Sequence, residues 1–180
     1  MKKATRAEKS TAYHEAGHAV ARYYLFHPIR KVTICPDKND DSAGHCEGKG
    51  RSYLDGIDVE ISPRKQSRMF DNIKILLAGR EAQRRFNKRS KRSVLNCQAH
   101  SDWRKAVDLA IRLTTSTRGT ELLLEWLRHE TESFVQLRWS DIEAVAAELL
   151  DRKTLTGEEV REIISLRYGP LPANETEEAK

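Results

Sequence analysis

The stretch AYHEAGHAVARYY, residues 12–24, constrains the fold most because it places metal-binding side chains on a helical pattern. His14 and His18 are four positions apart, so on a helix their β-carbons lie on one face, about 6 Å apart, within reach of one tetrahedral metal ion. Glu15 lies about 100° around the helix from His14, outside direct metal contact but near a metal-bound water. This spacing predicts a zinc-dependent hydrolytic site with His14 and His18 as ligands and Glu15 as general base.

The same segment also fits an ordinary core helix that carries three polar side chains. Gly17 does not separate the two interpretations. A glycine inside a helix costs about 1 kcal/mol relative to alanine and indicates close approach of another element, at a metal site or in a packed core. The residues of this segment alone leave both interpretations open.

Helical periodicity begins at the N-terminus and is interrupted once by a short β region. Apolar residues recur at helical spacing over 4–27, and Pro28 is expected to end that helix. β-Branched residues predict a strand at 30–35, and a second strand is expected near 43–47. The segment 36–61 is rich in turn-forming residues and is expected to form a hairpin and a mobile loop.

The rest of the chain is predicted to be helical. Ser62 and Pro63 supply the cap and first turn of a helix that runs to about Phe86. Three or four more helices follow, with starts expected near Ser101, near Gly119, at Ser140 and at Thr156. The last two begin with predicted capping boxes, Ser140 with Glu143 and Thr156 with Glu159.

Length and composition indicate one globular domain. The chain has 180 residues, enough for one core but few for two, and its polar end has no core stripe. We therefore expect a single domain over 1–168 and a disordered tail over 169–180.

No apolar run approaches the roughly 20 residues of a membrane span, and the charged N-terminus is not a signal core, which predicts a cytoplasmic protein. The odd number of widely spaced cysteines, Cys35, Cys46 and Cys97, suits reduced thiols.

A basic run, RRFNKRSKR at 84–92, raises the possibility of a nucleic-acid partner, since the formal net charge is +5. The residues that would carry it are Arg84, Arg85, Lys88, Arg89, Lys91 and Arg92. The competing interpretation is a solvated loop or helix end. No aromatic-rich RNA-binding motif accompanies the run, which disfavours nucleic acid.

Five motifs resemble, in the same order, the peptidase domain of the FtsH-type membrane AAA+ zinc proteases. They are AYHEAGHA (12–19), KVTI (31–34), LLAGREAQ (76–83), HSDWRKAVDLA (100–110) and LLDRKTLTGEEVREII (149–164). The middle motifs are weak individually, and the common order makes the set specific. The resemblance implies a mainly α fold, a zincin-like helical metallopeptidase domain with a small β-hairpin or edge strand by the active site.

The same resemblance implies Zn²⁺ as cofactor and an aspartate as third ligand, which the SD motif places on Asp102. Without the resemblance, Asp102 is a carboxylate in the first turn after a cap at Ser101, where the helix dipole stabilises negative charge in any case. His100 and Cys97 are nearby residues with metal-binding chemistry, and either is a rival for the third position.

Two departures from the family pattern affect the expected partners. The sequence contains no Walker A loop, so we expect the chain to lack its own ATPase module. An AAA+ ATPase that acts in trans is then a candidate partner, because the family couples proteolysis to unfolding. SAGHCEGKG, 42–50, stands where the family has an LG segment beside its edge strand. By resemblance, KVTI is expected to lie along the cleft, where an extended peptide could add as a strand.

These observations favour a zinc endopeptidase that cleaves flexible or unfolded proteins, with His14, His18 and Asp102 as metal ligands and Glu15 as general base. Two alternatives belong to other classes: a non-catalytic zinc-stabilised scaffold or regulator, and the nucleic-acid-binding module. The physiological substrate, the cleavage preference and the oligomeric state do not follow from the sequence.

Overall fold

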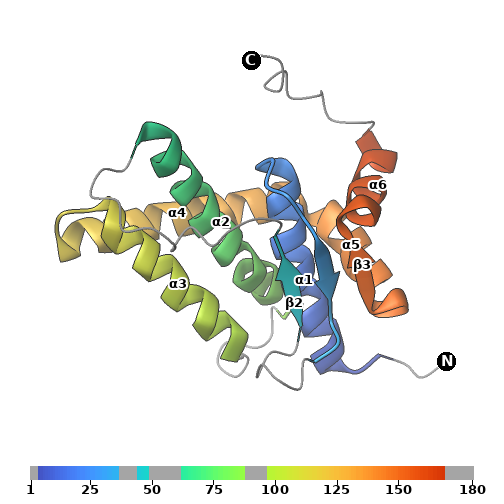
Figure 1. Cartoon of the computed structure of the whole chain (residues 1–180). Helices are drawn as coiled ribbons and strands as arrows, with labels where there is room; N and C mark the ends of the chain where they lie inside the picture. The colour runs from blue at the N-terminus through green and yellow to red at the C-terminus, as the bar shows by residue number, and fades with distance from the viewer. Residues whose placement is uncertain (1–3, 37–43, 49–61, 88–96, 169–180) are drawn as a thin grey trace, which may run out of the picture.

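The computed structural model describes residues 4–36, 44–48, 62–87 and 97–168, which form a mainly α fold with one small sheet (Figure 1). In chain order the elements are α1 (Arg6–Tyr24), β1 (Lys31–Thr33), β2 (His45–Glu47), α2 (Pro63–Phe86), α3 (Cys97–Leu113), α4 (Thr117–Leu137), α5 (Trp139–Arg152), β3 (Thr154–Thr156) and α6 (Gly157–Tyr168). The predicted fold class is confirmed. The tail 169–180 and most of the predicted loop lie outside the described residues, so the domain boundary stays a prediction.

Helix α1 lies inside the molecule, between α2 and α5 (Figure 1). Its start is fixed by a reciprocal cap, in which Glu8 N donates to Thr5 Oγ1 at 3.2 Å and Thr5 N donates to Glu8 Oε2 at 2.8 Å. The helix ends three residues earlier than predicted. Phe26 adopts the left-handed conformation (φ 56°), so a turn before Pro28 closes the helix.

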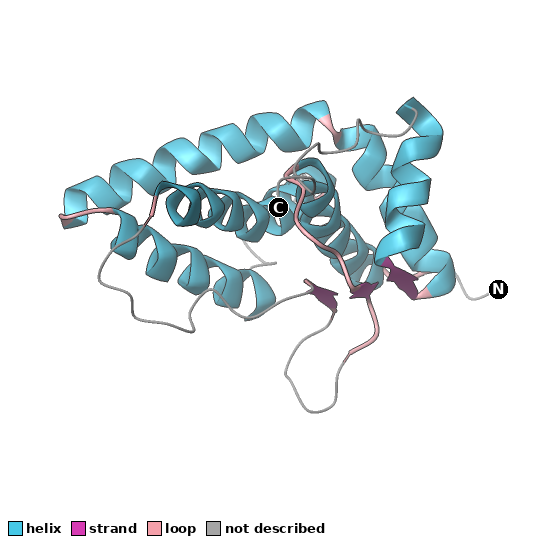
Figure 2. Ribbon diagram, turned by 45° about the horizontal axis from the view of Figure 1, so that its top comes forward, coloured by secondary structure: helices cyan, strands magenta, loops and turns pink. Residues whose placement is uncertain are grey.

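The sheet has the strand order β2-β1-β3 with antiparallel pairing throughout, and its strands lie together beside the helices (Figure 2). Val32 of β1 is paired with Cys46 of β2 on one side and with Leu155 of β3 on the other. The predicted strands β1 and β2 are confirmed, whereas β3 was not predicted. Because both sides of β1 are paired, the expectation that a peptide adds to KVTI is wrong. Within the described residues the outer strands of the sheet are β2 and β3.

Local capping chemistry explains where three more helices begin. Lys65 N donates to Ser62 Oγ at 3.3 Å, which confirms the predicted start of α2. Glu159 N donates to Thr156 Oγ1 at 3.2 Å and Thr156 N donates to Glu159 Oε2 at 2.7 Å, which confirms the capping box of α6. In addition, α4 begins at Thr117 with Ser116 as its cap, two residues before the expected Gly119.

The predicted cap at Ser140 is wrong. Helix α5 begins at Trp139, directly after Arg138, and has no side-chain cap hydrogen bond. The Arg138 carbonyl accepts from Asp141 N and Ile142 N, both at 3.1 Å, so the chain is already helical at Ser140. The close succession of α4 and α5 leaves no extended residue that could act as a side-chain cap.

The buried residues form two clusters. The first joins α1, the sheet, α5 and α6 with one side of α2 and the end of α4, and the second joins the rest of α2 and α4 with α3. The carboxylate of Asp141 is buried beside the first cluster and links two helices. Tyr24 Oη of α1 donates to its Oδ2 at 2.9 Å, and Arg167 Nε of α6 lies 3.4 Å from its Oδ1. Among the described residues no helix is both long and apolar enough to span a membrane.

Candidate metal centre

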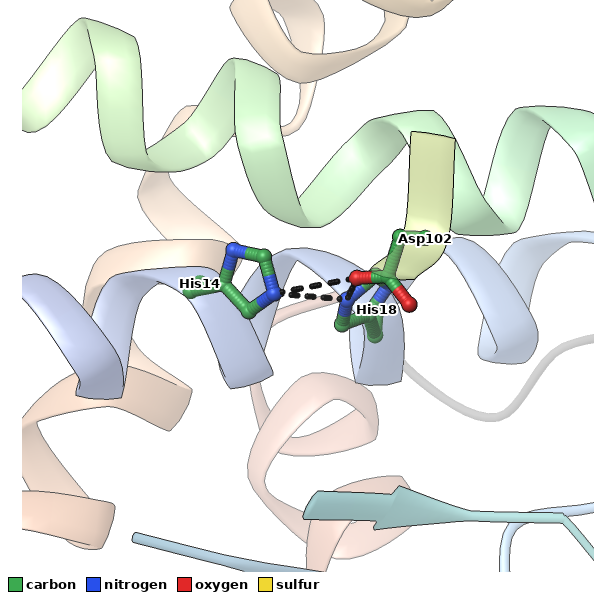
Figure 3. A group of neighbouring side chains, drawn as sticks. All are labelled: His14, His18 and Asp102. Carbon is green, nitrogen blue, oxygen red and sulfur yellow. Dashed lines mark hydrogen bonds and ion pairs between the residues drawn. The ribbon is translucent and has the colours of Figure 1, made fainter. Parts of the chain in front are cut away.

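Three side chains from two helices converge on one point (Figure 3). His14 and His18 project from α1 with their Nε2 atoms 3.1 Å apart. Asp102 projects from α3 and places its Oδ2 3.2 Å from His14 Nε2 and 3.1 Å from His18 Nε2. The fold therefore brings together all three residues that the sequence analysis proposed as metal ligands.

The ring of His18 is held in one tautomer by the backbone of α2. Its Nδ1 lies 2.7 Å from the carbonyl oxygen of Ile75. A carbonyl only accepts hydrogen bonds, so Nδ1 carries the proton and donates it. In the neutral ring Nε2 then has a free lone pair, which faces His14 and Asp102. This is the outer-contact arrangement typical of metal-ligating histidines.

The donor set fits a small divalent cation. Two imidazole nitrogens and one carboxylate oxygen are the ligands of many catalytic zinc sites, which keep a fourth position open. Zinc–ligand bonds of about 2.0–2.1 Å in a tetrahedron place ligand atoms about 3.3–3.4 Å apart. The three observed separations are 3.1–3.2 Å, so only small adjustments are needed. His14 Nδ1 is buried and has no hydrogen-bond partner among the described residues. The polar contacts of the His14 ring are therefore those that its Nε2 makes with His18 and Asp102.

The charges within the site reinforce one another. Burial alone would raise the pKa of Asp102, but the charge of His18 and the hydrogen bonds from His14 and His18 hold it well below its usual range. Burial alone would lower the pKa of His18, but the charge and hydrogen bond of Asp102 raise it above its ordinary value. The metal-free site thus favours a carboxylate facing a positively charged imidazole.

Glu15 lies beside the three candidate ligands and is not among them. Its side chain is buried, and burial raises its pKa against the opposing charges of His14 and His18. Gly44, directly before β2, covers it: a β-carbon at Gly44 would lie 3.0 Å from Glu15 Cγ. The carboxyl group is thus near the metal position in a partly desolvated environment, as a general base requires.

Two helical glycines bring α1 and α2 close together at the site. A β-carbon at Gly17 would lie 2.6 Å from the carbonyl oxygen of Ala78, and one at Gly79 would lie 2.4 Å from His18 Nε2. Gly17 therefore marks the crossing of the two helices, and Gly79 leaves room for the ligand ring. Gly79 was not identified from the sequence, although a glycine within the helical motif LLAGREAQ was a possible signal.

The structure corrects the expected environment of Asp102. Helix α3 begins at Cys97, four residues before the cap expected at Ser101, so Asp102 lies in the second turn and not in the first. Its negative charge is stabilised mainly by the two histidines. The side chains of the rival ligands His100 and Cys97 lie outside the described residues.

The basic run is engaged in contacts within the protein where the structure describes it. Arg84 pairs with the buried Glu81 at 2.8 Å, and the Arg85 guanidinium carbon lies 4.8 Å from the ring centroid of Trp139. Residues 88–92 lie outside the described part. Cys35 and Cys46 are free thiols, in agreement with the expectation for these two cysteines.

Comparison with known proteins decides the family. The sequence model of peptidase family M41 matches residues 1–119. The chain belongs to peptidase family M41. It is an FtsH-type peptidase domain, as the five ordered motifs predicted.

The relatives are much longer proteins. The chain is 25% identical to the ATP-dependent zinc metalloprotease FtsH of Thermus thermophilus over 197 residues, which cover 88% of this chain and 29% of that protein. The corresponding protein of Haemophilus influenzae is 30% identical over 166 residues, 91% of this chain and 24% of its own length. The mouse mitochondrial inner membrane m-AAA protease component AFG3L1 is 37% identical over 83 residues, 44% of this chain and 9% of its own. The chain thus spans less than a third of each of these proteins.

Proposed function

We propose that this domain is a zinc-dependent endopeptidase in which His14, His18 and Asp102 hold the metal and Glu15 is the general base. The observation that carries the proposal is the convergence of three ligand atoms within 3.2 Å of one another, with a buried glutamate directly after the first ligand in sequence. The zinc metalloprotease names of the M41 relatives support the identity of the metal.

The residues of the site have distinct roles in this reaction. When bound, zinc would act as a Lewis acid that lowers the pKa of water to about 7 and polarises a peptide carbonyl. The Glu15 carboxylate would accept a proton from the attacking water and pass it to the leaving amine, and the raised pKa of Glu15 favours the first of these transfers. The Ile75 carbonyl keeps the proton of His18 on Nδ1, so the ring cannot turn its N–H toward the metal position.

The substrates proposed are flexible or unfolded polypeptides. Strand β2 is an outer strand of the sheet, and the residue that precedes it, Gly44, lies against Glu15. An extended peptide that adds to the outer edge of β2 would form main-chain hydrogen bonds, which tolerate many sequences. The proposed peptide-binding strand is therefore β2 and not β1, which is paired on both sides.

An AAA+ ATPase partner is proposed to supply unfolded chains. The FtsH relatives are named as ATP-dependent, and the part of them that this chain matches is under a third of their length. Without such a partner, cleavage should be confined to substrates that are already unfolded. Candidate ATPases that never increase the cleavage of a folded substrate would contradict this part of the proposal.

The direct test is cleavage of a fluorescently quenched, unfolded casein by the zinc-loaded protein, with Glu15→Gln purified in parallel. Cleavage by the wild type that Glu15→Gln abolishes, while still binding zinc, is the expected result. Equal cleavage by both proteins would rule out Glu15 as the base.

A zinc-stabilised scaffold is the second candidate, and one observation favours it. The candidate ligands come from α1, which belongs to the first buried cluster, and from α3, which belongs to the second, so a metal would add a link between two clusters that α2 and α4 already join. If neither protein cleaves casein and His18→Ala unfolds the chain, the scaffold becomes the better account.

A further inference from the structure

Asp102 depends on the position of α3, because it is the ligand that does not lie on α1. The segment before α3, 88–96, lies outside the described residues. Beyond Asp102, α3 is anchored in the second buried cluster by three apolar residues, Ala106, Leu109 and Ala110. The first of these lies about one helical turn after Asp102. A contact nearer to Asp102 would hold the turn that presents its carboxylate to His14 and His18.

Trp103 supplies such a contact. It packs against the second cluster, and the guanidinium carbon of Arg80 on α2 lies 5.6 Å from its ring centroid. This distance is within the range of a cation–π interaction. Trp103 is the residue directly after Asp102, so the contact acts on the same turn of α3.

Among the described residues, Arg80 is in no ion pair within 4.0 Å, and its charge acts weakly on the neighbouring Glu81. Its Nε is buried without a hydrogen-bond acceptor. Its neighbour Glu81 pairs with Arg84, and no carboxylate of the described residues lies within ion-pair distance of Arg80. The contact with the Trp103 ring is therefore the direct side-chain interaction of this guanidinium among the described residues.

The same stretch of α2 also contacts the other helix of the site. The Ile75 carbonyl accepts from His18, and Gly79 lies against the His18 ring. Arg80 directly follows Gly79. One stretch of α2 thus contacts His18 directly and contacts the turn that carries Asp102 through Trp103.

We propose that Arg80 and Trp103 are positioning residues of the metal centre, a role that rests on the proposed His14, His18 and Asp102 site. Successive side chains on a helix are about 100° apart, so holding the Trp103 ring fixes the rotation of α3 about its axis. That rotation aims the Asp102 carboxylate at the two imidazoles. Neither residue is expected to touch the metal or the substrate.

The test compares zinc affinity among paired variants, measured by competition with a chromogenic chelator. Arg80→Met and Trp103→Leu keep apolar bulk but remove the cation or the ring. Both are expected to weaken zinc binding about three- to tenfold. This loss of affinity lies between the factor that one cation–π contact corresponds to and the factor lost when an outer contact of a metal ligand is removed. Arg80→Lys and Trp103→Phe keep the interaction and should stay within about twofold of the wild type. Arg64→Met, at an exposed position of the same helix, is the control and should not change the affinity.

Thermal unfolding of the metal-free variants separates positioning from general packing. Arg80→Met should melt within about 3 °C of the wild type, which corresponds to less than about 1 kcal/mol in a domain of this size. Wild-type affinity in Arg80→Met and Trp103→Leu would overturn the proposal. Equal weakening in Arg80→Lys, together with a large loss of metal-free stability, would also overturn it. A wild type that binds no zinc would instead overturn the metal centre itself, and the positioning role with it.

Discussion

His18 donates its Nδ1 proton to the carbonyl oxygen of Ile75 across 2.7 Å, so a backbone atom of α2 determines which nitrogen of an α1 side chain is available to a metal. The close approach that permits this bond is visible at Gly79, one turn further along α2, where even a β-carbon would meet the ring. The geometry of the candidate metal centre therefore depends on how closely the two helices pack.

Replacing Gly79 by alanine tests that dependence. The added β-carbon would lie 2.4 Å from His18 Nε2, so the ring or the helix must move. We expect zinc affinity to fall at least about tenfold and the free energy of unfolding to fall by about 1–3 kcal/mol. Chelator competition and urea unfolding measure the two effects. Gly119→Ala, the same change in α4, is the control, and equal zinc affinity in all three proteins would contradict the packing argument.

Zinc affinity should depend on pH through His18. Its pKa is raised above the ordinary value of about 6.5 by the facing Asp102, despite burial, so the metal-free site keeps a proton to higher pH than a free histidine does. Zinc must displace that proton. The affinity should therefore rise with pH through the raised pKa and level off above it. Competition measurements from about pH 6 to about pH 9 would contradict this if the affinity were already constant above about pH 6.5.

Glu15→Gln should stabilise the metal-free protein at neutral pH. Burial raises the pKa of Glu15, so the folded state favours the neutral acid while the unfolded state ionises near the ordinary value of about 4.3. Stability is then lost as pH rises between these two pKa values, and the loss persists above the higher one. Glutamine cannot ionise and escapes this loss.

The matching measurement is urea unfolding of the metal-free proteins at about pH 4 and about pH 7, values that lie on either side of an ordinary glutamate pKa. The advantage of Glu15→Gln should appear at the higher pH and largely vanish at the lower one. Glu125→Gln, at an exposed position of α4, is the control. A destabilised Glu15→Gln at pH 7 would mean that the glutamate contributes to folding and not to catalysis alone.

Local chemistry made much of the fold predictable from the sequence. The starts of α2 and α6 follow from side chains within three residues of the helix, Ser62 before Pro63 and Thr156 with Glu159. Strand β3 was missed because its three residues acquire strand character only by pairing with β1, more than 100 positions earlier in the chain. The wrong cap at Ser140 has a similar cause, since the direct succession of α4 and α5 overrides a suitable local motif.

The candidate site divides in the same way. His14 and His18 are one helical turn apart, so their shared face follows from sequence spacing. Asp102 is 84 positions beyond His18, and only the family resemblance connected the two. The contacts of Gly79 and the pairing of Arg80 with Trp103 depend on how α2 crosses α1 and α3, which no local pattern encodes.

The most direct test of the account is the zinc content and zinc affinity of Asp102→Ala beside the wild type, with Asp108→Ala, an exposed carboxylate of the same helix, as control. The account predicts one tightly bound zinc per chain in the wild type and in Asp108→Ala. It predicts that Asp102→Ala loses more than the roughly ten- to hundredfold in affinity that loss of an outer contact costs. Undiminished zinc binding by Asp102→Ala would contradict the His14, His18 and Asp102 centre and would assign the third position to another residue, such as His100 or Cys97.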